Sequence, residues 1–88
     1  MKVSFRRSFA KDLKKIRSKA LLHNVQDVIE QLEQRSSLHE IPNVKHLTSD
    51  GSYYRIRIGE YRLGLLVDDD TVTVVRFLHR RDIYRYFP

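Results

Sequence analysis

The chain has 88 residues, with 17 Lys and Arg against 11 Asp and Glu, which gives a formal net charge of +6. It contains no cysteine, so disulfides, thiolate metal sites and a cysteine nucleophile are excluded. No apolar run approaches the length of a membrane span, and the first residues lack the apolar core of a signal peptide. We therefore expect one domain over residues 1–88, located in the cytoplasm. Its charge favours a polyanionic partner, either nucleic acid or an acidic protein, although a basic surface can also serve solubility alone.

The first third of the chain predicts a short strand over residues 2–5 and then two helices. Ser8 is a candidate N-cap for the first helix, whose apolar stripe is Phe9, Leu13 and Ile16. After a break near Ser18, the second helix carries the stripe Leu21, Val25, Val28, Ile29 and Leu32. A connection this short predicts an antiparallel helical hairpin that packs on one face of a sheet.

Residues 35–50 lose this periodicity, and we expect them to form a loop. Val44 is predicted to anchor the loop to the core, whereas Lys45 points outward. Asp50–Gly51 is a typical turn sequence and indicates the start of the next strand.

Residues 53–63 form the most informative stretch. Apolar or aromatic residues alternate with arginines up to Ile58, which is the period of a half-buried strand. Gly59–Glu60 is typical of a two-residue hairpin turn, so Arg57 faces Arg62 across the hairpin. Directly opposed arginines repel each other, and folding alone gives no reason to pair them, whereas a phosphate group between them would bind. The same register places Gly64 opposite Arg55 and predicts an open surface there.

The following strands extend this pattern. Three aspartates at 68–70 form a polar turn, and a metal site there would need ligands from elsewhere, so no metal is expected. A three-residue closure pairs Arg62 with Arg76 and keeps Thr73, Val75 and Phe77 on the face that the helices cover. Arg76 would then join the arginine face.

The tail, residues 79–88, predicts one helical turn after the last strand. This turn would bring His79, Arg80 and Tyr84 near the arginine face. Aromatic side chains between arginines suit base stacking beside phosphate binding. The alternative is that Tyr84 and Phe87 simply fold the tail onto the sheet.

The predicted fold class is α+β, a small, mostly antiparallel sheet with an N-terminal helical hairpin packed on one face. This order of elements, the Tyr-Arg-x-Arg-x-Gly-x-Tyr-Arg pattern of residues 54–62 and the closing His79-Arg80-Arg81-Asp82-Ile83-Tyr84 resemble the RelE/ParE superfamily of toxin–antitoxin toxins. The resemblance covers essentially the whole chain. Toxins similar to RelE are ribosome-dependent endoribonucleases that cut messenger RNA in the decoding site, and those similar to ParE poison DNA gyrase. Both are silenced by a cognate antitoxin.

The resemblance implies roles for individual residues. It assigns a catalytic set of Arg57, Arg62, His79, Arg80 and Tyr84. We also expect RNA binding by basic residues on or beside the arginine face: Arg55, Arg76, Lys45 and Arg81. Relatives often have lysines at the positions of Arg55 and Arg57. An arginine binds anionic groups but hardly transfers protons, so the arginine at position 57 argues against a general-base role there. The implied partners are a cognate antitoxin, the ribosome and messenger RNA, with no membrane and no small-molecule cofactor.

RNA cleavage by its own 2′-hydroxyl has three requirements: deprotonation of that hydroxyl, stabilisation of a phosphorane-like dianion and protonation of the leaving oxygen. The arginines can supply the second, and His79 and Tyr84 are the candidates for proton transfer. No carboxylate is placed for the task, so the site looks incomplete without the ribosome. Two other functions stay open: a gyrase poison of the ParE kind and a basic nucleic-acid-binding module without catalysis.

Overall fold

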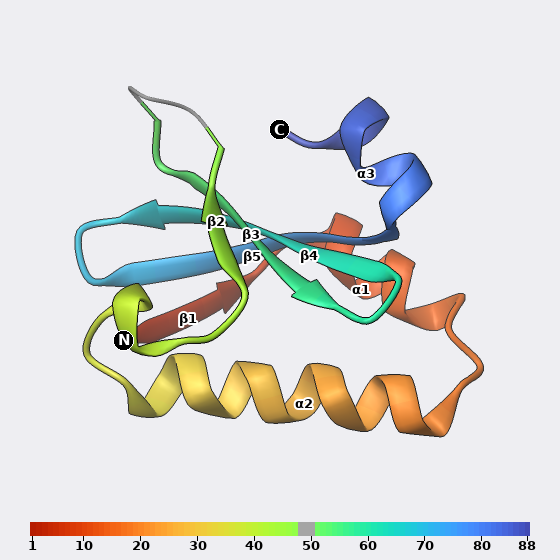
Figure 1. Ribbon diagram of the computed structural model, residues 1–88, viewed down its shortest axis with the longest axis horizontal. Coiled ribbons are helices and arrows are strands. Elements are labelled where there is room, and N and C mark those ends of the chain that lie inside the picture. The colour runs from red at the N-terminus through yellow and green to blue at the C-terminus, as the bar shows by residue number, and fades with distance from the viewer. Residues whose placement is uncertain (48–50) are drawn as a thin grey trace.

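The computed structural model describes residues 1–47 and 51–88, which form a five-stranded sheet and three α-helices (Figure 1). The elements are β1 (Lys2–Phe5), α1 (Arg7–Lys14), α2 (Lys19–Gln34), the short 3-10 turn η1 (Leu38–Glu40), β2 (Val44–His46), β3 (Tyr53–Ile58), β4 (Tyr61–Asp68), β5 (Thr71–His79) and α3 (Arg80–Tyr86). The strand order is β1-β5-β4-β3-β2, and β1 pairs with β5 in parallel while the other neighbours are antiparallel. The predicted α+β class is confirmed.

Helix α2 covers one face of the sheet and forms the main core with it (Figure 1). Ser18 caps the helix, since its hydroxyl accepts the backbone N–H of Leu21 at 3.1 Å. The predicted stripe turns inward, with Val25 and Leu32 fully buried. They meet apolar residues that alternate along the strands, among them Ile56, Ile58, Leu63, Leu65, Val72, Val74 and Phe77. The opposite face of β3 is therefore left for its arginines.

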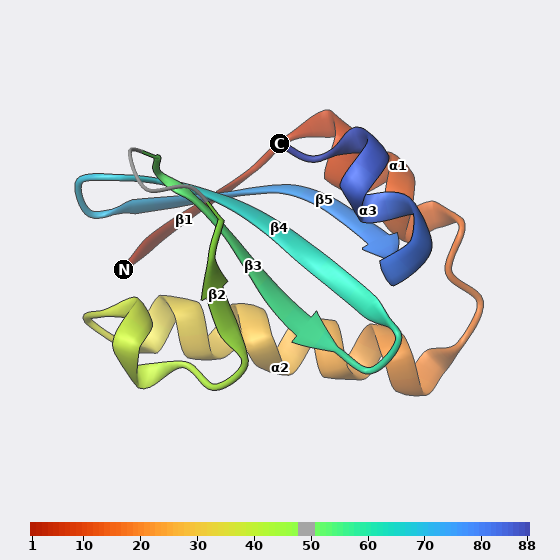
Figure 2. The same cartoon turned by 45° about the horizontal axis from the view of Figure 1, so that its top comes forward.

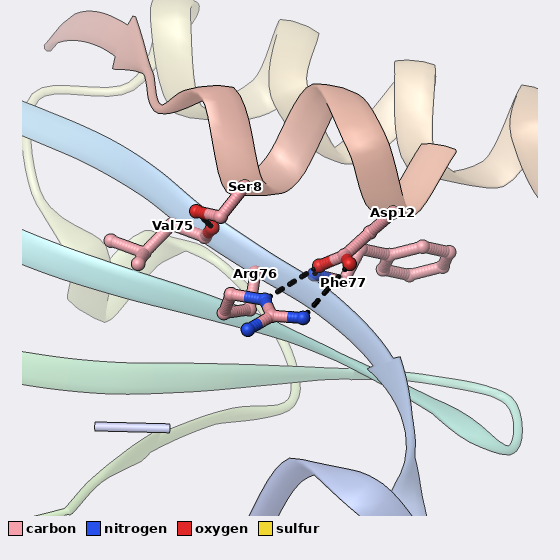
Figure 3. A network of polar contacts seen from close by, with 5 residues as sticks. All are labelled: Ser8, Asp12, Val75, Arg76 and Phe77. Carbon is pink, nitrogen blue, oxygen red and sulfur yellow. Dashed lines mark hydrogen bonds and ion pairs between the residues drawn. The ribbon is translucent and has the colours of Figure 1, made fainter. Parts of the chain in front are cut away.

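Helix α1 lies along the edge of β5 that β1 leaves free, and Phe9 joins it to the core. The prediction that Ser8 caps this helix is wrong: Arg6 occupies the N-cap position without a side-chain bond. Instead, the Ser8 hydroxyl donates to the Val75 carbonyl, and the Asp12 carboxylate accepts the backbone N–H of Phe77 at 2.9 Å (Figure 3). Side chains of α1 thus make the hydrogen bonds to the β5 backbone that a neighbouring strand would otherwise make at this edge.

The β3–β4 hairpin has the predicted register. Ile58 faces Tyr61, Arg57 faces Arg62 and Arg55 faces Gly64. Gly59 adopts a positive φ of 59°, as the two-residue turn requires. The two arginines of β3 and Arg62 consequently share the face away from α2.

The β4–β5 register differs from the prediction. Arg62 pairs with Leu78, and Arg76 pairs with Gly64. The turn uses two residues instead of three, and an irregularity between Gly64 and Leu65 places an extra residue on β5. Because of the bulge, the other set of alternating side chains in the first half of β5 faces the core. Val72 and Val74 are therefore buried, whereas the prediction placed Thr73 and Val75 there. Phe77 is buried as predicted.

Strand β2 lies within the segment that was predicted to be a loop. Val44 pairs with Ile56 and packs on the core, and Lys45 pairs with Arg55. The prediction failed here because three residues are too few to show a period of two. The predicted turn at Asp50–Gly51 includes Asp50, which lies outside the described residues.

Helix α3 lies on the side of the sheet away from α2 (Figure 2). Ile83 and Phe87 are buried, and the Phe87 ring occupies the space above Gly64, where an added Cβ would lie 2.9 Å from ring carbons. The surface beside Arg55 is therefore covered by the tail, contrary to the open surface predicted there. Among the described residues, no helix is long and apolar enough to cross a membrane.

Candidate functional site

Four cations from three neighbouring strands converge on the face away from α2. They lie in two directly opposed pairs, Lys45 with Arg55 and Arg57 with Arg62. A pocket of ≈ 350 Å³ opens between them, lined by Asn43, Val44, Lys45, Arg55, Arg57 and Arg62; we call it the basic pocket. None of these described lining residues is acidic, so the pocket concentrates positive potential.

Arg55 forms the inner wall of the basic pocket. It is only 8% exposed, and its guanidinium lies 4.7 Å from the centre of the Tyr84 ring. Its Nη2 also lies 3.4 Å from the Tyr84 hydroxyl, a long hydrogen bond. The Tyr84 side chain is 72% exposed. One face of the ring is therefore held by a cation while most of its surface is open to solvent.

Arg57 and Arg62 form the outer part of the pocket, and each is held by hydrogen bonds. Arg57 donates from Nη2 to the side-chain oxygen of Asn43 at 3.1 Å. Arg62 donates from Nη1 to the carbonyls of Gly59 and Tyr61, both at 2.9 Å. These bonds restrain two long side chains beside each other despite their like charge.

His79 is not brought to the basic pocket. It pairs with Tyr61 on the face that α2 covers, and it lines a separate pocket with Asp12, Lys15, Asp82 and other residues. Its Nδ1 accepts the backbone N–H of Arg81 at 3.1 Å, so the residue acts as the N-cap of α3. The prediction that the tail carries His79 to the arginine face is wrong, because β5 ends with that side chain on the opposite face.

Arg80 and Arg81 lie at the start of α3, outside the basic pocket. The Arg80 Nε pairs with the Glu60 carboxylate at 2.9 Å, and the Arg80 backbone N–H donates to the Glu60 carbonyl at 2.8 Å. Arg80 therefore lies against the same β3–β4 turn that Arg62 contacts. The Arg81 side chain is exposed and turns back to His79.

Arg76 is engaged by α1 and does not line the basic pocket. Its Nε and Nη2 donate to the two oxygens of Asp12 at 2.8 and 3.0 Å (Figure 3). This hydrogen bonding raises the pKa of the Arg76 guanidinium above its ordinary value. The RNA-binding role predicted for Arg76 rested on a place opposite Arg62, and the structure puts it opposite Gly64 instead.

The sequence interpretation missed two residues that hold arginines of the sheet, Asn43 and Asp12. Asn43 lines the basic pocket, and the Asn-after-Pro sequence at 42–43 signals only a turn. Asp12 is only 4% exposed, although it lies among lysines in a helix that looks solvated. The sequence did offer one signal, since Asp12 is the only acidic residue of a basic helix. A carboxylate that is buried requires a charged or hydrogen-bonding partner.

The arrangement suits the binding of phosphate by two or more arginines. Guanidinium groups bind phosphate oxygens with paired hydrogen bonds, and the exposed Tyr84 ring offers a stacking surface for a base. The Tyr84 hydroxyl also carries an exchangeable proton and lies within a long hydrogen bond of Arg55. Within residues 1–47 and 51–88, no group of three or more His, Cys, Asp or Glu side chains gathers as a metal would require.

Comparison with known proteins agrees with the fold. Residues 3–84 match the family described as the ParE toxin of the type II toxin–antitoxin system. The chain is 39% identical over 89 residues to Toxin RelE3 of Methanocaldococcus jannaschii, with the full length of both covered. Its structure resembles the RelB–RelE antitoxin–toxin complex from Methanococcus jannaschii, with a TM-score of 0.82, 36% identity and coverage of 97% of this chain and 99% of that one.

A more distant solved structure has the same fold. The RelBE2 toxin–antitoxin complex from Mycobacterium tuberculosis matches with a TM-score of 0.67 and 28% identity, covering 90% of this chain and 96% of the other. Family match, identity and fold all agree with the resemblance read from the sequence. The chain is a member of the RelE/ParE superfamily of type II toxin–antitoxin toxins.

Proposed function

We propose that this toxin is a ribosome-dependent endoribonuclease that cleaves messenger RNA in the decoding site. The observation that carries the proposal is the pair of like-charged cross-strand contacts, Lys45 with Arg55 and Arg57 with Arg62. Each such pair costs folding stability, since like charges repel across a sheet. A phosphate bound between them turns the cost into binding energy, which is the reason to keep four cations around one pocket.

The chemistry divides between this protein and its partner. Arg57 and Arg62 stabilise the dianion that forms when the 2′-hydroxyl attacks the neighbouring phosphate. Arg55 holds the Tyr84 ring, on which the base stacks. Arg80 reaches the same RNA once it exchanges Glu60 for a phosphate.

Proton transfer is the task for which the pocket is poorly equipped. Its described lining contains no acid and no histidine, and arginine is a poor group for proton transfer. Tyr84, which is hydrogen-bonded to Arg55, is the side chain that we propose as a candidate for proton transfer. We therefore propose that the ribosome orients the RNA and completes the proton path, which makes cleavage dependent on the ribosome.

We further propose that a cognate antitoxin silences the toxin by covering the basic pocket. Two similar proteins were solved as complexes with an antitoxin. Within the part of the chain that the structure describes, Arg57, Arg62 and Lys45 form no salt bridge, so their charges favour an acidic segment there. Hydrogen exchange of the purified complex tests this proposal, because protection that avoids β2, β3 and β4 would contradict it.

Inhibition of DNA gyrase is the second candidate, since the matching family is described by its ParE toxin. The two candidates differ in what they need from the basic pocket. A gyrase poison requires binding alone, whereas a nuclease leaves cut messenger RNA.

Mapping messenger RNA 5′ ends after induction separates them. New ends within codons, reproduced by the purified toxin on programmed ribosomes, support the nuclease. Intact messenger RNA together with gyrase-dependent DNA breaks would replace it by the gyrase poison.

A further inference from the structure

Asn43 holds Arg57 at two points. The residue precedes β2 and adopts a positive φ of 66°. Its backbone carbonyl accepts the Arg57 backbone N–H at 3.1 Å, and its side-chain oxygen accepts Nη2 of the same residue at 3.1 Å. Among the described residues, the Arg57 guanidinium makes no other hydrogen bond.

The Arg57 guanidinium needs such a restraint. The residue is exposed, and Arg62 repels it directly across the hairpin. An arginine side chain populates many rotamers, so an unrestrained Arg57 would sample positions away from the pocket. Arg62 is restrained separately by the carbonyls of the turn.

We infer that Asn43 is a positioning residue for RNA cleavage, which fixes the Arg57 guanidinium where the scissile phosphate binds. The inference rests on the proposed nuclease function. Pre-organised donors stabilise developing charge without reorganising during the reaction, so loosening Arg57 should slow the chemical step more than it weakens binding.

The chemistry of the site favours asparagine over its alternatives. An aspartate would hold Arg57 equally well but would neutralise the charge that binds phosphate. Alanine would lack the acceptor and would be strained at a positive φ, whereas glycine tolerates that φ and lacks only the side chain. Asn43→Gly and Asn43→Asp therefore separate positioning from charge.

The decisive experiment is a double-mutant cycle between Asn43 and Arg57, measured as single-turnover cleavage of messenger RNA on programmed ribosomes. We expect Asn43→Gly to slow cleavage roughly tenfold and to have no further effect when Arg57 is already alanine. Asn43→Asp should slow cleavage at least as much and reduce the salt dependence of binding to a short single-stranded RNA by about one ion. Asp69→Gly is the matched control, because Asp69 has a similar φ of 53° in the β4–β5 turn, away from the pocket.

A second readout does not depend on activity. In the arginine side-chain ¹⁵N–¹H spectrum, Asn43→Gly should let the Arg57 guanidinium rotate freely, while Asn43→Asp should keep it restrained. A loss of unfolding temperature without a change at Arg57 would assign Asn43 to the fold alone and overturn the inference.

The outcomes distinguish the two proposals. If Arg57→Ala is impaired but Asn43→Gly cleaves at the wild-type rate, the positioning role fails and the nuclease proposal stands. If the losses from the two variants multiply, Asn43 acts independently of Arg57 and the positioning role also fails. If Arg57→Ala itself binds RNA and cleaves like the wild type, the proposed phosphate site is wrong, whatever Asn43 does.

Discussion

Asp12 of α1 and Arg76 of β5 form a two-point ion pair across 64 positions of sequence, and the same carboxylate accepts the backbone N–H of Phe77. With Ser8, these bonds fasten α1 to the strand edge that β1 leaves uncovered (Figure 3). The pair therefore explains a charge of β5 that the sequence had assigned to RNA. Arg76 belongs to the scaffold, and the basic pocket lies on the neighbouring strands β4, β3 and β2.

We predict that Asp12→Ala destabilises the protein by about 3 kcal/mol, because it leaves a buried N–H and a partly buried guanidinium without partners. Asp12→Asn should cost less, since an amide oxygen can still accept from Phe77. Urea unfolding measures both changes, with Asp27→Ala as the control at an exposed acid of α2. An Asp12→Ala protein that unfolds at the wild-type urea concentration would show that the pair does not secure α1.

Gly64→Ala should release α3 from the sheet. The new Cβ would lie 2.9 Å from carbons of the Phe87 ring, so the ring must move away. Faster amide hydrogen exchange in α3 measures this release. Phe87→Ala alone should expose α3 similarly, and combining the two should add little, because both remove the same contact. Additive effects would mean that the Gly64–Phe87 contact does not hold the helix.

Arg57→Ala should slow messenger RNA cleavage about a hundredfold while leaving the unfolding free energy nearly unchanged, since its side chain is exposed and repelled by Arg62. Arg62→Ala should slow cleavage as much but also cost about 1 kcal/mol, because two turn carbonyls lose a donor. Arg85→Ala, an exposed cation of α3, is the charge-matched control. Equal activity of all three variants would remove the basic pocket from the mechanism.

Two substitutions of Tyr84 should show whether its hydroxyl or its ring takes part in cleavage. Tyr84→Phe keeps the stacking ring, so a loss of about a hundredfold would assign proton transfer to the hydroxyl, whereas a loss in Tyr84→Ala alone would assign stacking. We expect the second result, because the ring is exposed and rests on Arg55.

His79→Ala should weaken α3 through the lost N-cap and leave the shape of the pH–rate profile unchanged. Single-turnover cleavage from pH 5.5 to 8.5, with circular dichroism of each variant, makes the comparison. Loss of an ascending limb of the pH–rate profile in His79→Ala would restore the histidine as a base.

Glu60→Gln should strengthen RNA binding modestly. It removes the carboxylate that occupies Arg80, and both side chains are more than half exposed, so the pair adds little to stability. Titration of labelled single-stranded RNA at several salt concentrations should show a steeper salt dependence, by up to about one ion. Arg80→Ala should cancel the gain. Unchanged binding in Glu60→Gln would indicate that Arg80 does not reach the RNA.

The sequence by itself determined the central hairpin and the second helix. Alternation with a period of two and a two-residue turn fix the pairing of Arg57 with Arg62, because strand register and turn length leave one solution. The apolar stripe of α2 settles which face it buries for the same local reason. The resemblance to the toxin superfamily rests on that hairpin, which explains why the fold and the family could be predicted together.

Only the tertiary structure decided which cations are free to act. A turn of two residues and one extra residue in β5 together moved Arg76 from Arg62 to Gly64 and towards Asp12, and no local pattern marks that bulge. The same holds for Phe87 on Gly64 and for Asn43 against Arg57. These contacts join residues from separate elements, so they stabilise the protein only once the elements have packed together. The periodicity of a single element therefore cannot predict them.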